Sequence, residues 1–292
     1  MEQGDAVPKR RLDAAPGSYA ELAQLLQEGL RARLRGLLGP DSFNRVTGNL
    51  LNWQAGLASE PHGDVPGLHR QSLRQGLQRP DSCMALAATS FLPWAPHPDR
   101  LALCGLEDFT EIHFDGRCPT GVRGTPPHIE VLASGRSGVV GVTVRVFDYL
   151  IQRRTRPSPA YRSLELPARM VPWAALLPEA DSDQRVFRHV DILTLAKLAL
   201  GLGRIFAHRP TRLLYLYLEP ARSSQLAPFA AHRQELARLV DGTRDSAVPL
   251  TAVSFRELWA GWRRGRAPQS VRAATAELRR RYAVAMPRAI SL

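Results

Sequence analysis

Lysine is almost absent from this chain of 292 residues, which contains only two. Cysteine is scarce as well: Cys83, Cys104 and Cys118 are odd in number and form no C-x-x-C pair. This excludes a disulfide framework and indicates a reducing, cytoplasmic setting. No apolar run reaches the length of a membrane span, so no membrane partner is expected. The N-terminal segment is polar and lacks the apolar core of a secretory signal.

Positive charge is what the chain has in excess. Its formal net charge is +12, from 39 lysines and arginines against 27 acids, and arginine supplies nearly all of it. Such a balance favours a polyanionic partner, nucleic acid first. The arginine, with 22 glycines and 23 prolines, also fits the codon bias of a GC-rich genome. Charge alone leaves both explanations open.

The first periodic segment predicts a helix. Ser18 and Glu21 form a capping box, and leucines recur at helical spacing from there to Leu38. Gly39 and the proline after it predict the end of this helix. A second, short helix is expected at 48–58.

Strand signals follow in the middle of the chain. The segment 82–92 is expected to be a strand, and 109–115 alternates apolar and polar residues as a half-buried strand does. Residues 128–148 predict a β-hairpin. Residues 152–187 are rich in arginine and proline and are expected to be irregular.

The segment 191–206 predicts a strongly apolar helix capped by Asp191. Its Gly201 and Gly203 indicate close helix packing rather than a nucleotide-binding loop. Further elements are expected as a strand at 212–220, a helix at 224–241 interrupted near Pro228, a strand at 249–255, and helices capped by Ser254 and Ser270.

This order of elements predicts an α/β protein whose mixed central sheet is flanked by helices. Three strands in a row form an antiparallel meander, and the apolar helix then crosses over to a parallel strand. We expect a flexible tail at 1–17, one α/β domain at 18–265 and a basic C-terminal helix at 266–292.

The hairpin has one apolar face. From 140 to 146 every even position is valine, and this period of two predicts a strand that packs against a helix. In the partner strand, Ile129, Val131 and Ala133 are expected to join the valine face.

The other face of the hairpin predicts a polar cluster. A four-residue loop at 135–138 keeps the faces matched and pairs Glu130 with Thr143 and His128 with Arg145. These four side chains are therefore expected on one surface. A solvated face with an arginine–glutamate pair would show the same spacing, so that alternative stays open.

The hairpin segment "PPHIEVLASGRSGVVGVTVRVFDYL" resembles the core of PD-(D/E)XK nuclease-like proteins. The pieces "GNLLNWQA", "DILTLAKLALGL", "LLYLYLEP" and "VSFRELWAGW" resemble further motifs of one bacterial group in that superfamily, in the same order, so the resemblance spans about residues 45–262. It implies a restriction-endonuclease-like αβββαβ core, here with C-terminal helical additions.

The resemblance also implies a site. The family's metal-binding Asp corresponds to Glu130, its second acid to Thr143 and its lysine to Arg145. In the family these positions hold a divalent metal and activate water for phosphodiester hydrolysis, so Mg²⁺ or Mn²⁺ would be the cofactor. A neutral threonine is a weak ligand for Mg²⁺, and Arg145 does not deprotonate at working pH. The catalytic motif is therefore degenerate.

A second carboxylate is needed to hold a metal beside Glu130. Asp115 or Glu111 would supply it if their strand turns the same face toward the site. Asp148 is another candidate, although strict alternation places it on the valine side unless the strand ends or bulges there.

Two functions follow. The first is a nucleic-acid-associated protein, most simply DNA-binding, that hydrolyses phosphodiesters with a weakened site. The alternative is a non-catalytic descendant that binds nucleic acid or a partner protein. In either case we expect Arg123, Arg136, Arg279 and Arg280 to contact nucleic acid. The sequence also leaves open whether the protein forms a homodimer.

Overall fold

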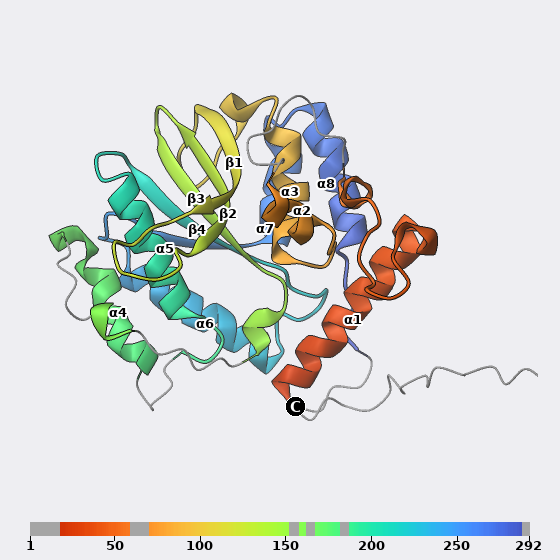
Figure 1. Ribbon diagram of the computed structural model, residues 1–292, viewed down its shortest axis with the longest axis horizontal. Helices are drawn as coiled ribbons and strands as arrows, with labels where there is room; N and C mark the ends of the chain where they lie inside the picture. Colours follow the sequence, from red (N-terminus) through yellow and green to blue (C-terminus); the bar gives the residue numbers. More distant parts are fainter. Residues whose placement is uncertain (1–17, 59–69, 152–157, 162–166, 182–186, 288–292) are drawn as a thin grey trace, which may run out of the picture.

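The computed structural model describes residues 18–58, 70–151, 158–161, 167–181 and 187–287 (Figure 1). The tail expected at 1–17 lies outside these residues. The described chain is an α/β fold with a five-stranded mixed sheet flanked by helices, as the sequence predicted.

The strands follow chain order across the sheet, β1-β2-β3-β4-β5. The first three pair antiparallel, whereas β3–β4 and β4–β5 pair parallel. Their bounds are β1 Phe109–Arg117, β2 His128–Gly135, β3 Gly138–Arg145, β4 Thr211–Tyr217 and β5 Leu250–Ser254. Because β3, β4 and β5 run in the same direction, their carboxyl ends meet at one edge of the sheet.

Helices cover both faces of this sheet (Figure 1). On one face lie α4, α5 and α6, and on the other α2, α3, α7 and α8, with α1 running beside α8. None of the described helices combines the length and apolarity that crossing a membrane requires. The helices are α1 Tyr19–Leu38, α2 Gln71–Leu77, α3 Cys83–Phe91, α4 Val171–Asp181, α5 Ile192–Ile205, α6 Ala227–Gly242, α7 Phe255–Arg264 and α8 Gln269–Arg281.

Local capping explains where three of these helices begin. Ser18 accepts a hydrogen bond from the Glu21 N–H at the start of α1, and Asp191 accepts from the Thr194 N–H at the start of α5. A capping box formed by Ser254 begins α7. Each cap satisfies a backbone N–H that the helix leaves without a partner.

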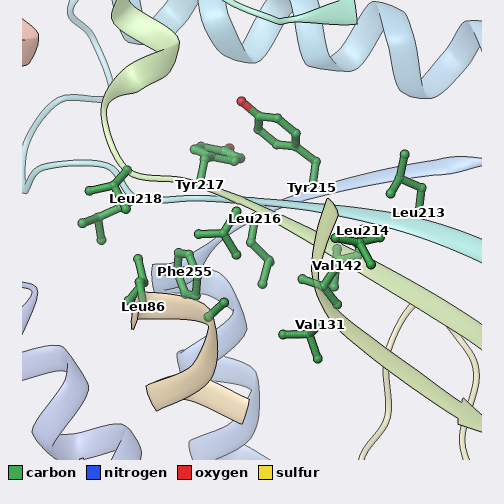
Figure 2. Packing of buried hydrophobic residues seen from close by; sticks show 14 of the residues in the cluster. Leu86, Val131, Val142, Leu213, Leu214, Tyr215, Leu216, Tyr217, Leu218 and Phe255 are labelled. Atoms are coloured by element: carbon green, nitrogen blue, oxygen red, sulfur yellow. The ribbon is translucent and has the colours of Figure 1, made fainter. Parts of the chain in front are cut away.

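Alternation along the strands separates the two layers of the core. Figure 2 shows Val131, Val142 and Leu214 pointing toward α3 and α7, whereas Tyr215 and Tyr217 point to the opposite side, toward α6. Both sets are buried. The valine face of the hairpin therefore packs on a helix, as predicted.

The predicted hairpin register is confirmed where the ladder is formed. Ser134 pairs with Val139, and the ladder continues from there to Val131 and Val142. Gly135 and Gly138 also pair, so only two residues remain in the turn rather than four. Ile129 is the exception to the predicted faces: a Cβ at Gly141 would meet its side chain, on the side where α5 packs.

Two expected elements are different in the structure. The segment 82–92 is not a strand but the helix α3, with Ser82 as its N-cap. Seven of its nine residues are buried, so no helical period is visible in the sequence, and a short apolar run does not by itself distinguish strand from helix. In place of a helix at 48–58 there is a 3₁₀ turn at Trp53–Gly56.

The region 152–187 was expected to be irregular, yet it contains α4. Pro178 lies inside this helix and concealed it in the sequence. The fully buried Trp173 holds the helix to the domain, since its indole N–H donates to the Val248 carbonyl at 2.8 Å. Pro228 does not interrupt α6 but lies in its first turn, where proline is tolerated.

The close packing predicted at the α5 glycines gives a stability test. A Cβ at Gly201 would overlap the backbone carbonyl of Cys118, whereas at Gly203 it would lie 3.0 Å from the flexible Met170 side chain. We expect Gly201→Ala to lower the free energy of unfolding by about 2 kcal/mol. Gly203→Ala is the matched control and should cost less, because the flexible Met170 side chain can move aside whereas the Cys118 backbone cannot. Urea denaturation of both variants measures this, and equal costs would contradict the packing.

Candidate functional site

The polar ends of β2 and β3 meet at the edge where the parallel strands terminate. The Val144 N–H donates to Glu130 Oε2 at 3.3 Å, and Arg145 donates through Nη1 to Thr143 Oγ1 at 3.2 Å and to the Val144 carbonyl at 2.8 Å. The structure thus brings together the three residues predicted to be catalytic.

Asp148 joins this cluster because the strand ends before it. Phe147 is fully buried and has φ 101°, a left-handed conformation that costs a non-glycine residue about 1–3 kcal/mol. This turn brings the Asp148 carboxylate to 3.5 Å from Arg145 Nε, and its other oxygen accepts from the Val146 N–H at 3.2 Å. Asp148 is therefore the second acid near Arg145. Strict alternation would have placed Asp148 on the valine side.

Burial and charge shift the pKa values of these groups. Burial raises the pKa of Glu130, against the opposing effects of Arg145 and of hydrogen bonds from Thr143 and Val144. Burial alone would lower the pKa of Arg145, but the negative charges of Asp148 and Glu130 outweigh it and the pKa is raised. The cluster is a compact ion-pair network around one permanently charged guanidinium.

Aromatic side chains pack against Arg145. Its guanidinium carbon lies 5.9 Å from the ring centre of Tyr215, whose hydroxyl is 3.0 Å from Nε2 of the fully buried His232. Tyr149 stacks on His232 at 4.0 Å and 13°. Burial holds the pKa of His232 well below its usual value, so the ring is neutral.

Sequence reasoning did not place these aromatic residues at the site. One signal was present: Tyr215 and Tyr217 alternate with leucines, and β4 pairs with β3 so that Thr143 lies beside Tyr215 and Arg145 beside Tyr217. Nothing local marks His232, because α6 reaches the sheet only through the tertiary fold.

Asp115, the other predicted metal ligand, has different partners. It accepts from the Ser72 hydroxyl at 2.5 Å and lies 2.7 Å from His128 Nδ1, while Arg70 donates to its backbone carbonyl. Burial would raise the pKa of Asp115, but the hydrogen bonds from Ser72 and His128 prevail and the pKa is lowered. His128, expected beside Arg145, is thus held by Asp115 instead. Glu111, the third candidate, contacts His113 and Ser134.

The residues present do not fit a divalent metal. Within the described ranges, no group of three or more His, Cys, Asp or Glu side chains is placed to hold one ion. Mg²⁺ takes oxygen ligands in near-octahedral order, usually one or two carboxylates together with waters. Glu130 and Asp148 both interact with Arg145, whose positive charge opposes a cation between them.

The predicted nucleic-acid contacts lie on separate parts of the surface. Arg123, Arg136, Arg279 and Arg280 are all exposed. Arg136 is in the β2–β3 turn, at the edge of the sheet away from Arg145, and Arg123 is in the loop between β1 and β2. Arg279 and Arg280 end α8, where Arg280 pairs with Glu277 at 2.6 Å.

The α7–α8 segment concentrates positive charge. Residues 255–284 contain eight arginines and two glutamates, so they hold half of the formal net charge of +12. We call the exposed arginines of this segment the α7–α8 arginine surface; they are Arg256, Arg263, Arg264, Arg266, Arg272, Arg279 and Arg280. The side chain of Arg33 in α1 donates to the Arg280 carbonyl, which places α1 against one end of this surface.

The raised pKa of Glu130 predicts a pH dependence of stability. The folded protein retains a proton on Glu130 that the unfolded chain releases, so the free energy of unfolding falls as the pH rises from 4.5, the ordinary value, to the raised pKa. Glu130→Gln removes this titration, and its stability should fall less than that of the wild type over this range. Urea unfolding at a series of pH values from about 4.5 to about 8 measures the difference.

Glu277→Gln is the control for this experiment. The pKa of Glu277 is lowered to about 2, mainly by its hydrogen bond with Arg280, so its contribution to stability is lost only in more acidic solution. The Glu277→Gln curve should therefore run parallel to that of the wild type above pH 4.5, the ordinary value for glutamate. If the Glu130→Gln curve also runs parallel, Glu130 does not titrate in this way.

Comparisons with models of protein families, with curated proteins and with solved structures gave no match for this chain. The resemblance to PD-(D/E)XK nuclease-like proteins therefore stays a prediction. The residues of the chain and their arrangement carry the functional proposal.

Proposed function

We propose that this protein binds nucleic acid, DNA first, through the α7–α8 arginine surface, and that it is a non-catalytic relative of PD-(D/E)XK nucleases. The observation that carries the proposal is the concentration of half the net charge in residues 255–284. Arginines spaced along two packed helices can contact successive phosphates of a nucleic-acid backbone.

Most of these arginines form no ion pair with an acid of the described residues. Among the described residues, ion pairs of the α7–α8 segment involve Glu277 with Arg280 and Arg281. Arg263, Arg266 and Arg272 are exposed and form no ion pair with any described residue. Their charge is thus free to attract an anion, because no salt bridge must first be broken.

The order of elements supports the nuclease ancestry. The elements α3, β1, β2, β3, α5 and β4 follow the αβββαβ order that the resemblance implies, with α4 as an additional helix between β3 and α5. Glu130, Thr143 and Arg145 lie together at the ends of the second and third strands, where the family holds its metal.

The same cluster supports the loss of hydrolysis. Thr143 supplies a neutral hydroxyl where the family has a second acid, and this hydroxyl accepts a hydrogen bond from Arg145. Arg145 is itself paired with Asp148 at 3.5 Å, so little of its charge is left to stabilise a phosphate. We infer that the former catalytic centre now has a structural role.

Charge reversal at matched positions tests the binding surface. The double variant Arg263→Glu, Arg264→Glu should weaken binding of a short DNA duplex by about tenfold or more and reduce the salt slope, because fewer counterions are released. The double variant Arg123→Glu, Arg136→Glu changes the net charge equally and should weaken binding by less than about threefold. Fluorescence anisotropy at several salt concentrations measures both.

Equal losses in the two double variants would show that net charge acts without a defined surface. No binding of DNA or RNA by the wild type would overturn the proposal and point to a partner protein.

Plasmid incubation tests the absence of hydrolysis. With Mg²⁺ or Mn²⁺, the wild type should leave supercoiled plasmid intact, because the described acids do not form a metal site. Cutting that a chelator stops and that Glu130→Ala abolishes would contradict the non-catalytic part of the proposal. That result would instead support a metal-dependent hydrolase.

A further inference from the structure

A cavity lies at the carboxyl ends of β4 and β5, away from the Arg145 cluster. Its volume is about 540 Å³, and its walls come from the segment after β4, from α7 and from the end of α8. In open α/β sheets, ligands bind outside the carboxyl ends of parallel strands. The apolar part of the wall is formed by Leu218, Pro220, Ala221, Trp259, Tyr282 and Val284.

Three arginines line the cavity as well. Arg222, Arg256 and Arg279 are exposed, and none forms an ion pair with another described residue. They come from three different elements, so the fold and not the chain order brings them together. Three guanidinium groups at one cavity favour an anion with several oxygens, and phosphate matches the planar fork of arginine.

A hydrogen-bond acceptor, Glu219, lines another part of the cavity. Glu219 follows β4, its side chain is 15% exposed, and it pairs with Arg233 at 2.6 Å. Burial raises the pKa of Glu219, although Arg233 opposes this. A carboxylate in such a position accepts hydrogen bonds from hydroxyl or amino groups, as acids in nucleotide sites do with ribose.

The wall after β4 is held in shape by backbone contacts. The Ala221 N–H donates to the Val284 carbonyl at 3.0 Å, and the Ser223 hydroxyl donates to the Pro220 carbonyl at 2.9 Å. Arg222, between them, has φ 65°, a conformation that costs a non-glycine residue free energy. These contacts fix the segment that presents Arg222 to the cavity.

We propose that this cavity binds a nucleoside phosphate. The aromatic and aliphatic wall takes the flat base, the arginines take the phosphate, and Glu219 accepts from a hydroxyl or amino group. The volume falls within the range of small-molecule sites, about 300–1,000 Å³. The ligand is either a free nucleotide or the terminal nucleotide of a strand. Its binding goes beyond the proposed function, although Arg256 and Arg279 belong to the α7–α8 arginine surface as well.

Calorimetry with the full chain tests the proposal. Adenosine 5′-monophosphate is the probe, and adenosine and inorganic phosphate, tested separately, are its fragments. The monophosphate should bind about tenfold or more tightly than either fragment, since only it reaches both the apolar wall and the arginines. No measurable binding of the monophosphate, or equal binding of inorganic phosphate, would overturn the proposal.

Two pairs of variants locate the binding. Ala283→Trp fills the cavity, whereas Ala273→Trp places the same side chain on an exposed position of α8 outside it. Arg279→Glu reverses a lining charge, whereas Arg100→Glu reverses an exposed charge that does not line the cavity and is not part of the α7–α8 arginine surface. The first member of each pair should weaken binding of the monophosphate about tenfold, and the second less than about twofold. Equal losses within both pairs would overturn the proposal.

The same variants separate the two sources of the ligand. If Ala283→Trp weakens the monophosphate but not a 5′-phosphorylated single strand, the ligand is a free nucleotide. If it weakens both, the cavity takes the strand end. Duplex binding by the α7–α8 arginine surface is measured independently, so its failure leaves this result intact.

Discussion

The guanidinium of Arg145, with its side chain only 14% exposed, is the constraint around which this part of the molecule is built. A buried permanent charge is stable only when opposite charges and hydrogen-bond acceptors surround it. Here Asp148 supplies the charge at 3.5 Å, and the Thr143 hydroxyl and the Val144 carbonyl accept hydrogen bonds. The left-handed turn at Phe147 brings Asp148 within reach of Arg145.

This network ties distant segments together. Tyr149, directly after Asp148, stacks on His232 of α6 and donates its hydroxyl to the Leu218 carbonyl beyond β4. Removing the charge at Arg145 would therefore loosen contacts among β3, β4 and α6, not only one side chain. In a hydrolase the same position would have to leave room for metal and substrate. We regard a closed ion-pair network and an open catalytic site as two alternative arrangements of the side chains at this edge of the sheet.

The arginines of this protein lie in two different environments. Arg145 is buried and neutralised and therefore stabilises the fold, whereas those of α7 and α8 are exposed and largely unpaired. Exposed ion pairs contribute little to stability, so a surface with few of them loses little and gains attraction for anions. Composition alone could not separate these environments, because it counts buried and exposed arginines alike.

The sequence by itself determined the strands, the hairpin register and three of the helix starts, those capped by Ser18, Asp191 and Ser254. Alternation such as that of Val140, Val142 and Val144 is a property of neighbouring residues, and so is a cap such as Ser18. For the same reason it predicted that Glu130, Thr143 and Arg145 would meet. Only the tertiary structure decided that 82–92 is a helix, because its burial on all sides hides the period.

Only the tertiary structure also decided the partners of the site. Asp148 reaches Arg145 through one torsion at Phe147, and His128 turns to Asp115, which no spacing rule describes. His232 and the cavity beside Trp259 depend on segments far apart in the chain. Local pattern sets which face a side chain takes, but packing between distant segments selects what it touches there.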